Sequence, residues 1–270
     1  MAEGIEKIFN ELVKQVAGIN TVNAIGLSGK LKPYPKPGEG DFDIFIYCDI
    51  VPNEQIRKKY LETLGDEIKD IKLSVFNNEA WGLSDYCTIN GIDTWLMFFN
   101  KNHVIRNVQE ILTGKYLERA DNYFFPIGRL GMLESLTVLY DKDKFLEELK
   151  RALSLYPKTL KEKMIAYNLE VLNDVEDLLR AVKRKDVLFY HFALDIALDH
   201  FLLALFAMNE TYFPSRKRSL QYIDKFEIKP SRCTERLLSI LQDGANANTL
   251  INSYEEFRQL CKELLELIRK

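Results

Sequence analysis

The hydrophobic and polar positions of this chain change their period near its middle. In the first half, short apolar runs alternate with amphipathic segments, and such patterns predict strands and helices in alternation. The second half carries helical patterns almost throughout. Pro157 marks the change, because the residue before a proline leaves the helical region. We therefore predict an α+β chain, with a mixed-sheet domain over residues 1–155 and an all-α helical bundle over residues 156–270.

The individual elements follow from these periods together with cap and turn residues. In the first half we predict helices over residues 2–17, 52–64, 102–112 and 141–155, and strands over residues 21–27, 42–50, 71–76, 84–89 and 91–98. Residues 137–140 fit a short strand or the end of a helix. In the second half we predict helices over residues 159–183, 186–209, 215–226, 231–242 and 249–269. Asn53 suits a helix N-cap, and Asn90-Gly91 suits a two-residue hairpin turn.

Composition and charge limit the classes of protein that the chain can represent. Of its 270 residues, 47% are hydrophobic and 29% are charged, which is ordinary for a globular protein and sufficient for two cores. The 37 basic and 40 acidic residues give a net charge of −3, so we do not expect broad electrostatic capture of nucleic acid. The four cysteines include no C-x-x-C pair, which is typical of reduced thiols in a cytosolic protein.

Two segments bear on the location of the protein. The N-terminal segment is an amphipathic helix that lacks the basic start and apolar core of a signal peptide. Residues 189–209 are long enough to span a membrane, but His191, Asp195, Asp199 and His200 interrupt them, and charges in mid-bilayer are costly. We therefore expect a buried helix, no membrane partner and a cytoplasmic location.

The candidate chemistry lies in residues 23–49. Gly26-Leu27-Ser28-Gly29-Lys30 ends one apolar run, and Asp41-Phe42-Asp43 begins the next. Residues two apart in a strand point to the same side, so the two carboxylates lie side by side. Such a pair repels unless a cation lies between, and Mg²⁺ is often held by one or two carboxylates plus substrate phosphates. Because a glycine-flanked turn lets backbone N–H groups approach those phosphates, the stretch predicts chemistry on a nucleoside triphosphate.

This order of strand, G-x-x-G-[KR] turn, variable loop and D-x-D strand resembles the nucleotidyltransferase fold of the DNA polymerase β superfamily. In particular, the chain resembles small bacterial nucleotidyltransferases of the aminoglycoside and lincosamide type, which move a nucleoside monophosphate to a hydroxyl of a small molecule. The second half, with Tyr156-Pro157-x-x-Leu160 and residues 209–217, resembles the helical domain attached to many of these enzymes. The resemblance implies an N-terminal nucleotidyltransferase domain, residues 1–155, followed by a helical bundle domain, residues 156–270.

The resemblance also implies roles for individual residues. Asp41, Asp43 and Asp93 would bind Mg²⁺ and serve catalysis, with Asp93 completing the second metal site or taking the hydroxyl proton. The nucleotide phosphates would be bound by Gly26, Ser28, Gly29, Lys30 and Lys217. Many family members carry adjacent Gly and Ser in the turn, and two alignments stay open here. Either Gly26, Gly29 and Lys30 match the G-x-x-G-R form, or Ser28-Gly29 replaces Gly-Ser.

We therefore expect a Mg²⁺-dependent enzyme that transfers AMP, with ATP as the expected triphosphate, to a hydroxyl of a small-molecule acceptor. The alternative is an antitoxin-like or binding protein whose transferase domain modifies or binds a protein partner. The family analogy leaves a homodimer open. His191, Asp195 and Asp199 line one helix face. They form either a polar wall of the acceptor pocket or a structural hydrogen-bond line, and we favour the structural role.

Overall fold

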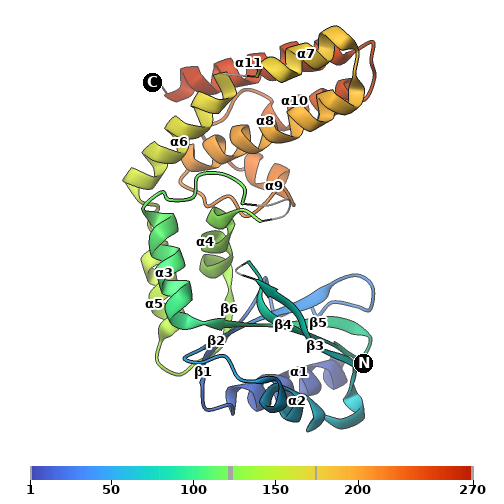
Figure 1. The fold of residues 1–270 in the computed structure, drawn as a ribbon, viewed down its shortest axis with the longest axis vertical. Coiled ribbons are helices and arrows are strands. Elements are labelled where there is room, and N and C mark those ends of the chain that lie inside the picture. Colours follow the sequence, from blue (N-terminus) through green and yellow to red (C-terminus); the bar gives the residue numbers. More distant parts are fainter. Residues whose placement is uncertain (1, 79, 121–123, 174, 269–270) are drawn as a thin grey trace. The chain divides into compact units, whose positions relative to one another are not determined.

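The computed structural model describes residues 2–78, 80–120, 124–173 and 175–268 (Figure 1). The chain forms two compact units. The first comprises Met1–Gln109 and Met132–Leu155, and the second comprises Glu110–Gly131 and Tyr156–Lys270. The dividing points fall inside helices α3 (Lys101–Leu112) and α4 (Pro126–Ser135). The division into domains 1–155 and 156–270 stays a prediction, and the compact units differ from it by residues 110–131.

A six-stranded mixed sheet forms the centre of the first unit. Its strands are β1 (Val22–Leu27), β2 (Asp41–Cys48), β3 (Ile68–Asn78), β4 (Gly82–Ile89), β5 (Ile92–Asn100) and β6 (Thr137–Asp141). They lie in the order β3-β4-β5-β2-β1-β6. The β2–β5 pair is parallel and the other pairs are antiparallel. The mixed α/β character of this unit and the helical second unit confirm the predicted α+β class.

Helices α1 (Ala2–Ala17) and α2 (Glu54–Glu62) cover one face of this sheet, below it in Figure 1. Every second residue of β2 supports this packing. Phe42, Ile44 and Ile46 are buried in one apolar cluster with Phe9 and other side chains of α1. Near one end of the opposite face, the ring of Tyr47 packs 5.3 Å from that of Phe145 at the start of α5 (Phe145–Leu153).

Most elements predicted for the first half are confirmed. The first helix has the predicted bounds, and Asn53 caps α2, because its side chain accepts a hydrogen bond from the backbone N–H of Ile56. Asn90 and Gly91 form the hairpin turn between β4 and β5 with φ of 50° and 77°. Positive φ at both central residues is the geometry that matches the strand twist, which is why Asn-Gly favours it. The third strand is longer than residues 71–76, and α5 begins later than residue 141.

Helix α4 is absent from the sequence prediction, and its glycines explain the omission. Glycine normally argues against a helix interior, and α4 contains Gly128 and Gly131. In the second unit a Cβ at Gly128 would lie 2.4 Å from the carbonyl oxygen of Pro214, and one at Gly131 would lie 3.1 Å from that of Tyr212. These glycines therefore allow close approach of another backbone segment, and no local pattern reveals that contact.

The second unit is built around α8 (Val187–Met208). The other helices are α6 (Lys158–Asn173), α7 (Glu176–Arg184), α9 (Ser219–Ile223), α10 (Cys233–Gly244) and α11 (Leu250–Ile268). Among the described residues, α8 is the one helix long and apolar enough to cross a membrane, and 72% of its apolar window is buried inside the structure. This burial agrees with the predicted internal helix.

Two predicted helices of the second half differ from the structure. Residues 159–183 form two helices, with α6 ending at Asn173 and α7 beginning at Glu176, while Asp174 lies outside the described residues. Residues 215–226 contain only the short α9, because Arg218 has a positive φ of 64° that a continuous helix does not tolerate. The last helix, predicted to end at Arg269, is described as far as Ile268, and Arg269 lies outside the described residues.

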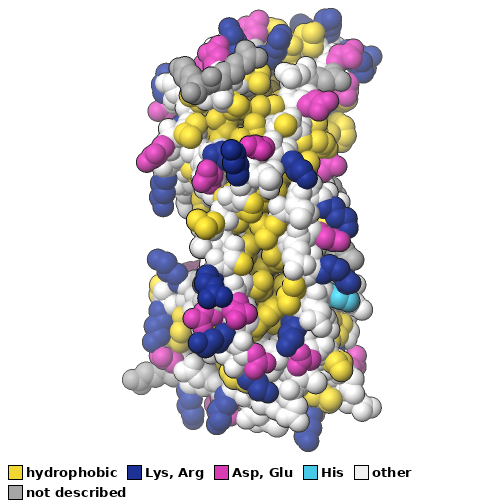
Figure 2. All heavy atoms as spheres, turned by 90° about the vertical axis from the view of Figure 1, so that its left-hand side faces the viewer, with side chains coloured by type: hydrophobic (Ala, Val, Ile, Leu, Met, Phe, Trp, Pro, Cys, Tyr) yellow, Lys and Arg dark blue, Asp and Glu magenta, His cyan; other side chains and the backbone are white. Residues whose placement is uncertain are grey.

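Charged side chains of both signs are interspersed over the face drawn in Figure 2. On that face, described Lys and Arg side chains do not gather into one extended basic patch. The mixture of charges on this face agrees with the composition, in which 37 basic residues nearly balance 40 acidic residues.

Candidate functional site

The three aspartates of the sequence prediction lie where the two central strands of the sheet, β2 and β5, begin, and this end of the strands is called the edge of the site below. Strands β2 and β5 run parallel, and their register pairs Asp41 with Asp93 and Asp43 with Trp95. Phe42, between the first two, is 1% exposed and belongs to the core cluster packed against α1. Because side chains alternate along a strand, Asp41 and Asp43 point to the opposite face. Asp93 shares that face, since register neighbours project to the same side of a sheet.

The glycine-containing turn after β1 meets the same edge. The backbone N–H of Ser28 donates to the carbonyl oxygen of Asp43 at 2.9 Å, and the hydroxyl of Thr137 donates to the carbonyl oxygen of Gly29 at 2.6 Å. These bonds hold the turn between β2 and β6. Gly29 has a φ of +78°, which L side chains rarely adopt. Ser28, Gly29 and Lys30 are exposed, so the turn presents its backbone and one cation to solvent.

Gly26 has a different position from the rest of the predicted turn. It lies inside β1, paired with Phe45 of β2 and Val138 of β6. A Cβ there would lie 2.9 Å from a methyl carbon of Leu136. The structure therefore gives Gly26 a packing contact inside the sheet, and the exposed part of the turn begins at Ser28. Its predicted part in phosphate binding stays a prediction.

Asp93 has a hydrogen-bond partner that the sequence analysis did not assign. The phenol of Tyr86, on β4, donates to Asp93 Oδ1 at 2.7 Å. This hydrogen bond, with smaller contributions from burial and from the carboxylate charge, raises the pKa of Tyr86 to about 12. Tyr86 stands opposite Trp95 in the β4–β5 pair. The cross-strand hydrogen bond therefore orients the Asp93 carboxylate and leaves its second oxygen available to other groups.

The donor atoms at this edge suit a hard divalent cation in chemical type. Asp41, Asp43 and Asp93 offer only carboxylate oxygens on one face, and Mg²⁺ prefers oxygen ligands completed by phosphate oxygens and water. Within the described ranges, however, no three or more His, Cys, Asp and Glu side chains are grouped so that they could hold a metal ion. The three-ligand set stays a prediction.

An aromatic surface continues from Asp93 across the neighbouring strands. Trp95 lies 5.0 Å from the Tyr86 ring and 5.5 Å from the ring of Phe76 on β3, measured between ring centroids. Phe76 is 46% exposed. The ammonium group of Lys72 lies 5.3 Å from the Tyr86 ring centroid, within the range of a cation–π interaction. The sequence analysis did not bring these rings together, because strand register and bulges are not visible in the residue order.

A buried ion pair on the other face of the sheet shapes β3. Arg57 of α2 binds Asp85 of β4 with Nε–Oδ2 at 2.7 Å, and their side chains are 2% and 0% exposed. Asp85 Oδ1 also accepts from the backbone N–H of Ser74 at 2.8 Å, and Arg57 donates to the Ser74 hydroxyl at 2.9 Å. Ser74 has a positive φ of 55° and lies where the β3–β4 register shifts between Lys72 and Phe76. The ion pair therefore holds the irregular part of β3 that carries Phe76.

Lys217 and the acidic residues of α8 lie in the second unit. Asp195 and Asp199 of α8 pair with Arg216, which approaches Asp199 at 2.5 Å, and with Arg119, at 3.2 and 3.3 Å. Burial raises the pKa of Asp199, although both arginines oppose the effect. The two carboxylates are thus matched by two guanidinium groups, as the structural role requires. Lys217 is exposed, and its predicted contact with triphosphate stays a prediction.

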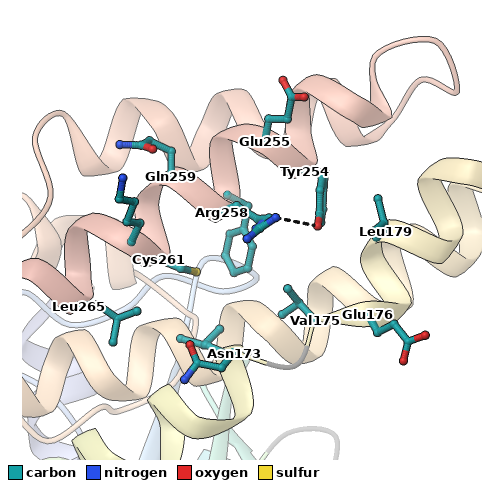
Figure 3. A pocket seen from close by; sticks show the side chains of 13 residues that line it. Asn173, Val175, Glu176, Leu179, Tyr254, Glu255, Arg258, Gln259, Cys261 and Leu265 are labelled. Atoms are coloured by element: carbon teal, nitrogen blue, oxygen red, sulfur yellow. Dashed lines mark hydrogen bonds between the residues drawn. The ribbon is translucent and has the colours of Figure 1, made fainter.

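The helical unit also contains an open pocket of about 660 Å³ between α7 and α11 (Figure 3). Arg258 lies beside Tyr254 on α11 and donates to its hydroxyl at 3.5 Å, at the long limit for a hydrogen bond. Glu176, Leu179 and Cys261 lie around it, so the lining mixes apolar groups with charges of both signs. This lining does not single out one class of ligand.

The chain is similar to a family of unknown function and, at a distance, to a solved structure. Residues 125–218 match the model of a family described as Domain of unknown function (DUF4037). No curated protein matches the chain. A solved structure, a nucleotidyltransferase-like protein from Exiguobacterium sibiricum 255-15, aligns with 100% of this chain and 80% of its own, at 11% sequence identity and a TM-score of 0.44. A similarity this distant carries no argument about the reaction.

Proposed function

We propose that the protein is a Mg²⁺-dependent nucleotidyltransferase that moves AMP from ATP to a hydroxyl group of a small molecule. The observation that carries the proposal is the register of β2 and β5, which aligns Asp41 with Asp93. The same register leaves Asp43 on their face. Carboxylates placed as neighbours on one face of a sheet repel one another. A nucleotide-bound Mg²⁺ would reduce that repulsion.

The turn supports the proposal from the other side of β2. The backbone N–H of Ser28 is already used in its hydrogen bond to the Asp43 carbonyl, which places the turn beside Asp43. A triphosphate bound at the turn, with the backbone N–H of Gly29 as a donor, would therefore lie beside Asp43. Lys30 would add a positive charge for the β- and γ-phosphates. When bound there, Mg²⁺ would neutralise charge on the phosphate oxygens during transfer.

The transfer itself requires one bond exchange at the α-phosphorus. The acceptor oxygen forms a bond to phosphorus, and the bond from phosphorus to the oxygen bridging to the β-phosphate breaks. Pyrophosphate leaves with that electron pair. The hydroxyl proton passes to the Asp93 carboxylate, whose Oδ1 is already hydrogen-bonded to Tyr86 and whose Oδ2 accepts the proton.

Thermal denaturation with ATP and Mg²⁺ tests the proposal before an acceptor is known. A ligand that binds only the folded protein stabilises it by about 2.7 kcal/mol at a concentration of 100 Kd. We expect the melting temperature to rise only when both ATP and Mg²⁺ are present. The rise should disappear in the double variant Asp41→Asn/Asp43→Asn.

The matched control is Asp66→Asn, which removes an exposed carboxylate elsewhere in the first unit. It should keep the full shift, which separates loss of the site from loss of surface charge. If the wild type shows no shift with any of the four common nucleoside triphosphates and Mg²⁺, the proposal is wrong. Mass spectrometry of reactions with candidate acceptors then tests transfer, since an added AMP identifies both nucleotide and acceptor.

A further inference from the structure

We propose that the rings of Phe76, Trp95 and Tyr86 form the binding surface for the acceptor, and that the acceptor is a small hydroxylated compound with a flat ring. This inference rests on the proposed function and adds the chemical class of the second substrate. The three residues are called the ring surface below. Trp95 lies two residues beyond Asp93 on β5, and Tyr86 and Phe76 lie on β4 and β3, the strands on the side of β5 away from the phosphate turn.

The order of the strands gives the direction from which the acceptor must arrive. In an in-line displacement, the attacking and leaving oxygens lie on opposite sides of the phosphorus atom. The phosphate turn follows β1, so the leaving pyrophosphate lies on the β1 side of the carboxylates. The sheet order β3-β4-β5-β2-β1-β6 then places the attacking hydroxyl on the side of β5, β4 and β3. The nucleoside is bonded to the same phosphorus through a different oxygen, so it points away from both the attacking hydroxyl and the leaving pyrophosphate.

The side chains on that side favour a flat ring. The centroid distances from Trp95 to Phe76 and Tyr86 are 5.5 and 5.0 Å, with interplanar angles of 33° and 57°. These rings therefore form a continuous tilted surface with Phe76 46% exposed at its outer end. Stacking on exposed aromatic side chains is a common way to bind a planar ring.

The hydrogen bond from Tyr86 to Asp93 joins this surface to the reacting groups. Because Tyr86 contacts both Trp95 and the Asp93 carboxylate, a ring stacked there lies within one side-chain length of Asp93. A hydroxyl group on such a ring, or on a sugar attached to it, can then reach Asp93 Oδ2. Lys72 borders the same surface and can pair with an acceptor that also carries a negative group.

Tryptophan fluorescence can test the surface directly, because the chain contains two tryptophans. In a Trp81→Phe background, Trp95 is the remaining fluorophore. We would titrate this protein with phenyl β-glucoside and with methyl β-glucoside, which share the sugar hydroxyls and differ in the ring. We expect quenching of Trp95 by the phenyl compound and an affinity at least tenfold higher than that of the methyl compound. Equal affinities, or no quenching by phenyl β-glucoside, would overturn the inference.

Matched variants separate the ring surface from general damage. Phe76→Ala should weaken binding of phenyl β-glucoside at least tenfold. Phe76→Tyr keeps a ring at this position and should bind with the affinity of the wild type. Val75→Ala shortens the neighbouring exposed residue of the same strand and should leave the affinity unchanged. Phe76→Ala with wild-type affinity would contradict the proposal, as would an equal loss in Val75→Ala.

A second titration distinguishes the acceptor from the nucleobase of ATP. With Mg²⁺ and the α,β-methylene analogue of ATP at saturation, quenching by phenyl β-glucoside should persist, because the two ligands occupy different places. Displacement by the nucleotide analogue would mean that the ring surface holds the nucleobase, and the inference would be wrong. Thermal shift with ATP and Mg²⁺ reports on the nucleotide site alone, whereas quenching without nucleotide reports on the ring surface alone. The two proposals can therefore fail separately.

Discussion

Tyr86 and Asp93 form a residue pair whose hydrogen bond can be followed by titration. The folded-state pKa of Tyr86 is raised from 10.0 to about 12, first because the phenol donates to Asp93. A raised pKa means that the stabilising bond is complete below pH 10 and is lost as the pH rises through about 12. We expect the difference in phenolate absorbance between the wild type and Tyr86→Phe to show one step near pH 12. In Asp93→Asn that step should move toward pH 10.

The control for this titration is Tyr222→Phe, which removes a tyrosine that is 41% exposed in the second unit. This variant should leave the step of Tyr86 in place. A step of Tyr86 near pH 10 in the wild type would show that the phenol does not donate to Asp93 in solution.

Gly29 offers a second test at the scale of one residue, because its φ of +78° suits glycine and its surroundings are open. A Cβ there meets nothing within 4 Å, so Gly29→Ala should act through backbone conformation alone. We expect a loss of about 1–2 kcal/mol in the free energy of unfolding, measured by chemical denaturation. We also expect weaker binding of ATP with Mg²⁺, measured by calorimetry, because strain in the turn displaces its N–H groups.

Gly38 provides a matched comparison, because it has φ of +77° and open surroundings in the loop before β2. Gly38→Ala should cost similar stability and leave nucleotide binding unchanged. If the two variants weaken nucleotide binding equally, the turn at Gly29 has no special part in the site.

Helix α2 is attached to the sheet by the buried pair of Arg57 and Asp85, and this attachment acts at the scale of whole elements. Asp85→Ala leaves the guanidinium group buried without its carboxylate, and breaking such a pair typically costs about 3–5 kcal/mol. We expect a loss of this size by chemical denaturation. Asp85 also accepts a hydrogen bond from the backbone N–H of Ser74 in β3. Hydrogen exchange of the backbone amides should therefore increase more in β3 than in the other strands.

The exposed pair of Lys58 and Glu62 on the same helix supplies the comparison, at 3.6 Å with both side chains more than half exposed. Glu62→Ala should cost less than about 1 kcal/mol, because solvent screens this pair. Similar losses in Asp85→Ala and Glu62→Ala would mean that the buried pair does not hold α2 and β3 together.

Local patterns predicted elements well where local interactions determine them, and poorly where a distant segment does. The cap at Asn53 and the turn at Asn90-Gly91 depend on neighbours in the chain, and both were correct. Helix α4 depends on the backbone at residues 212–214, which approaches its glycines, and it was missed. For the candidate site, sequence spacing indicated the aspartates and the turn. The Tyr86 hydrogen bond and the ring surface depend on strand register and on the bulges of β3, which no short spacing encodes.

At the scale of the whole molecule, each compact unit has a buried core of its own. A buried histidine in the second unit should make the stability of that unit depend on pH. In the second unit His200 is buried, with Nδ1 at 2.8 Å from Asn168 Oδ1. The Asn168 amide nitrogen donates to two backbone carbonyls, so its oxygen accepts and the histidine carries the proton on Nδ1. Burial lowers the pKa of His200, against the charges of Glu118 and Asp199.

A depressed histidine pKa gives a definite sign for the effect of pH. Above pH 6.5 both the folded and the unfolded states hold His200 neutral, so its contribution to stability is complete. As the pH falls below 6.5, the unfolded state takes up a proton that the folded state resists, and the free energy of unfolding decreases. The decrease is limited to about 1.4 kcal/mol for each unit of pKa difference. We therefore expect the helical unit to melt at a lower temperature at pH 5.5 than at pH 7.5.

His200→Asn tests this assignment, since the asparagine amide can donate to Asn168 as Nδ1 does and cannot be protonated in this range. Calorimetry of this variant should show a smaller difference between the two pH values than calorimetry of the wild type. His103→Asn, which replaces an exposed histidine of α3, should keep the wild-type difference. If His200→Asn also keeps that difference, acid acts through other groups. Since Asp199 and Arg216 lie in the same unit, their ion pair would be the next to vary.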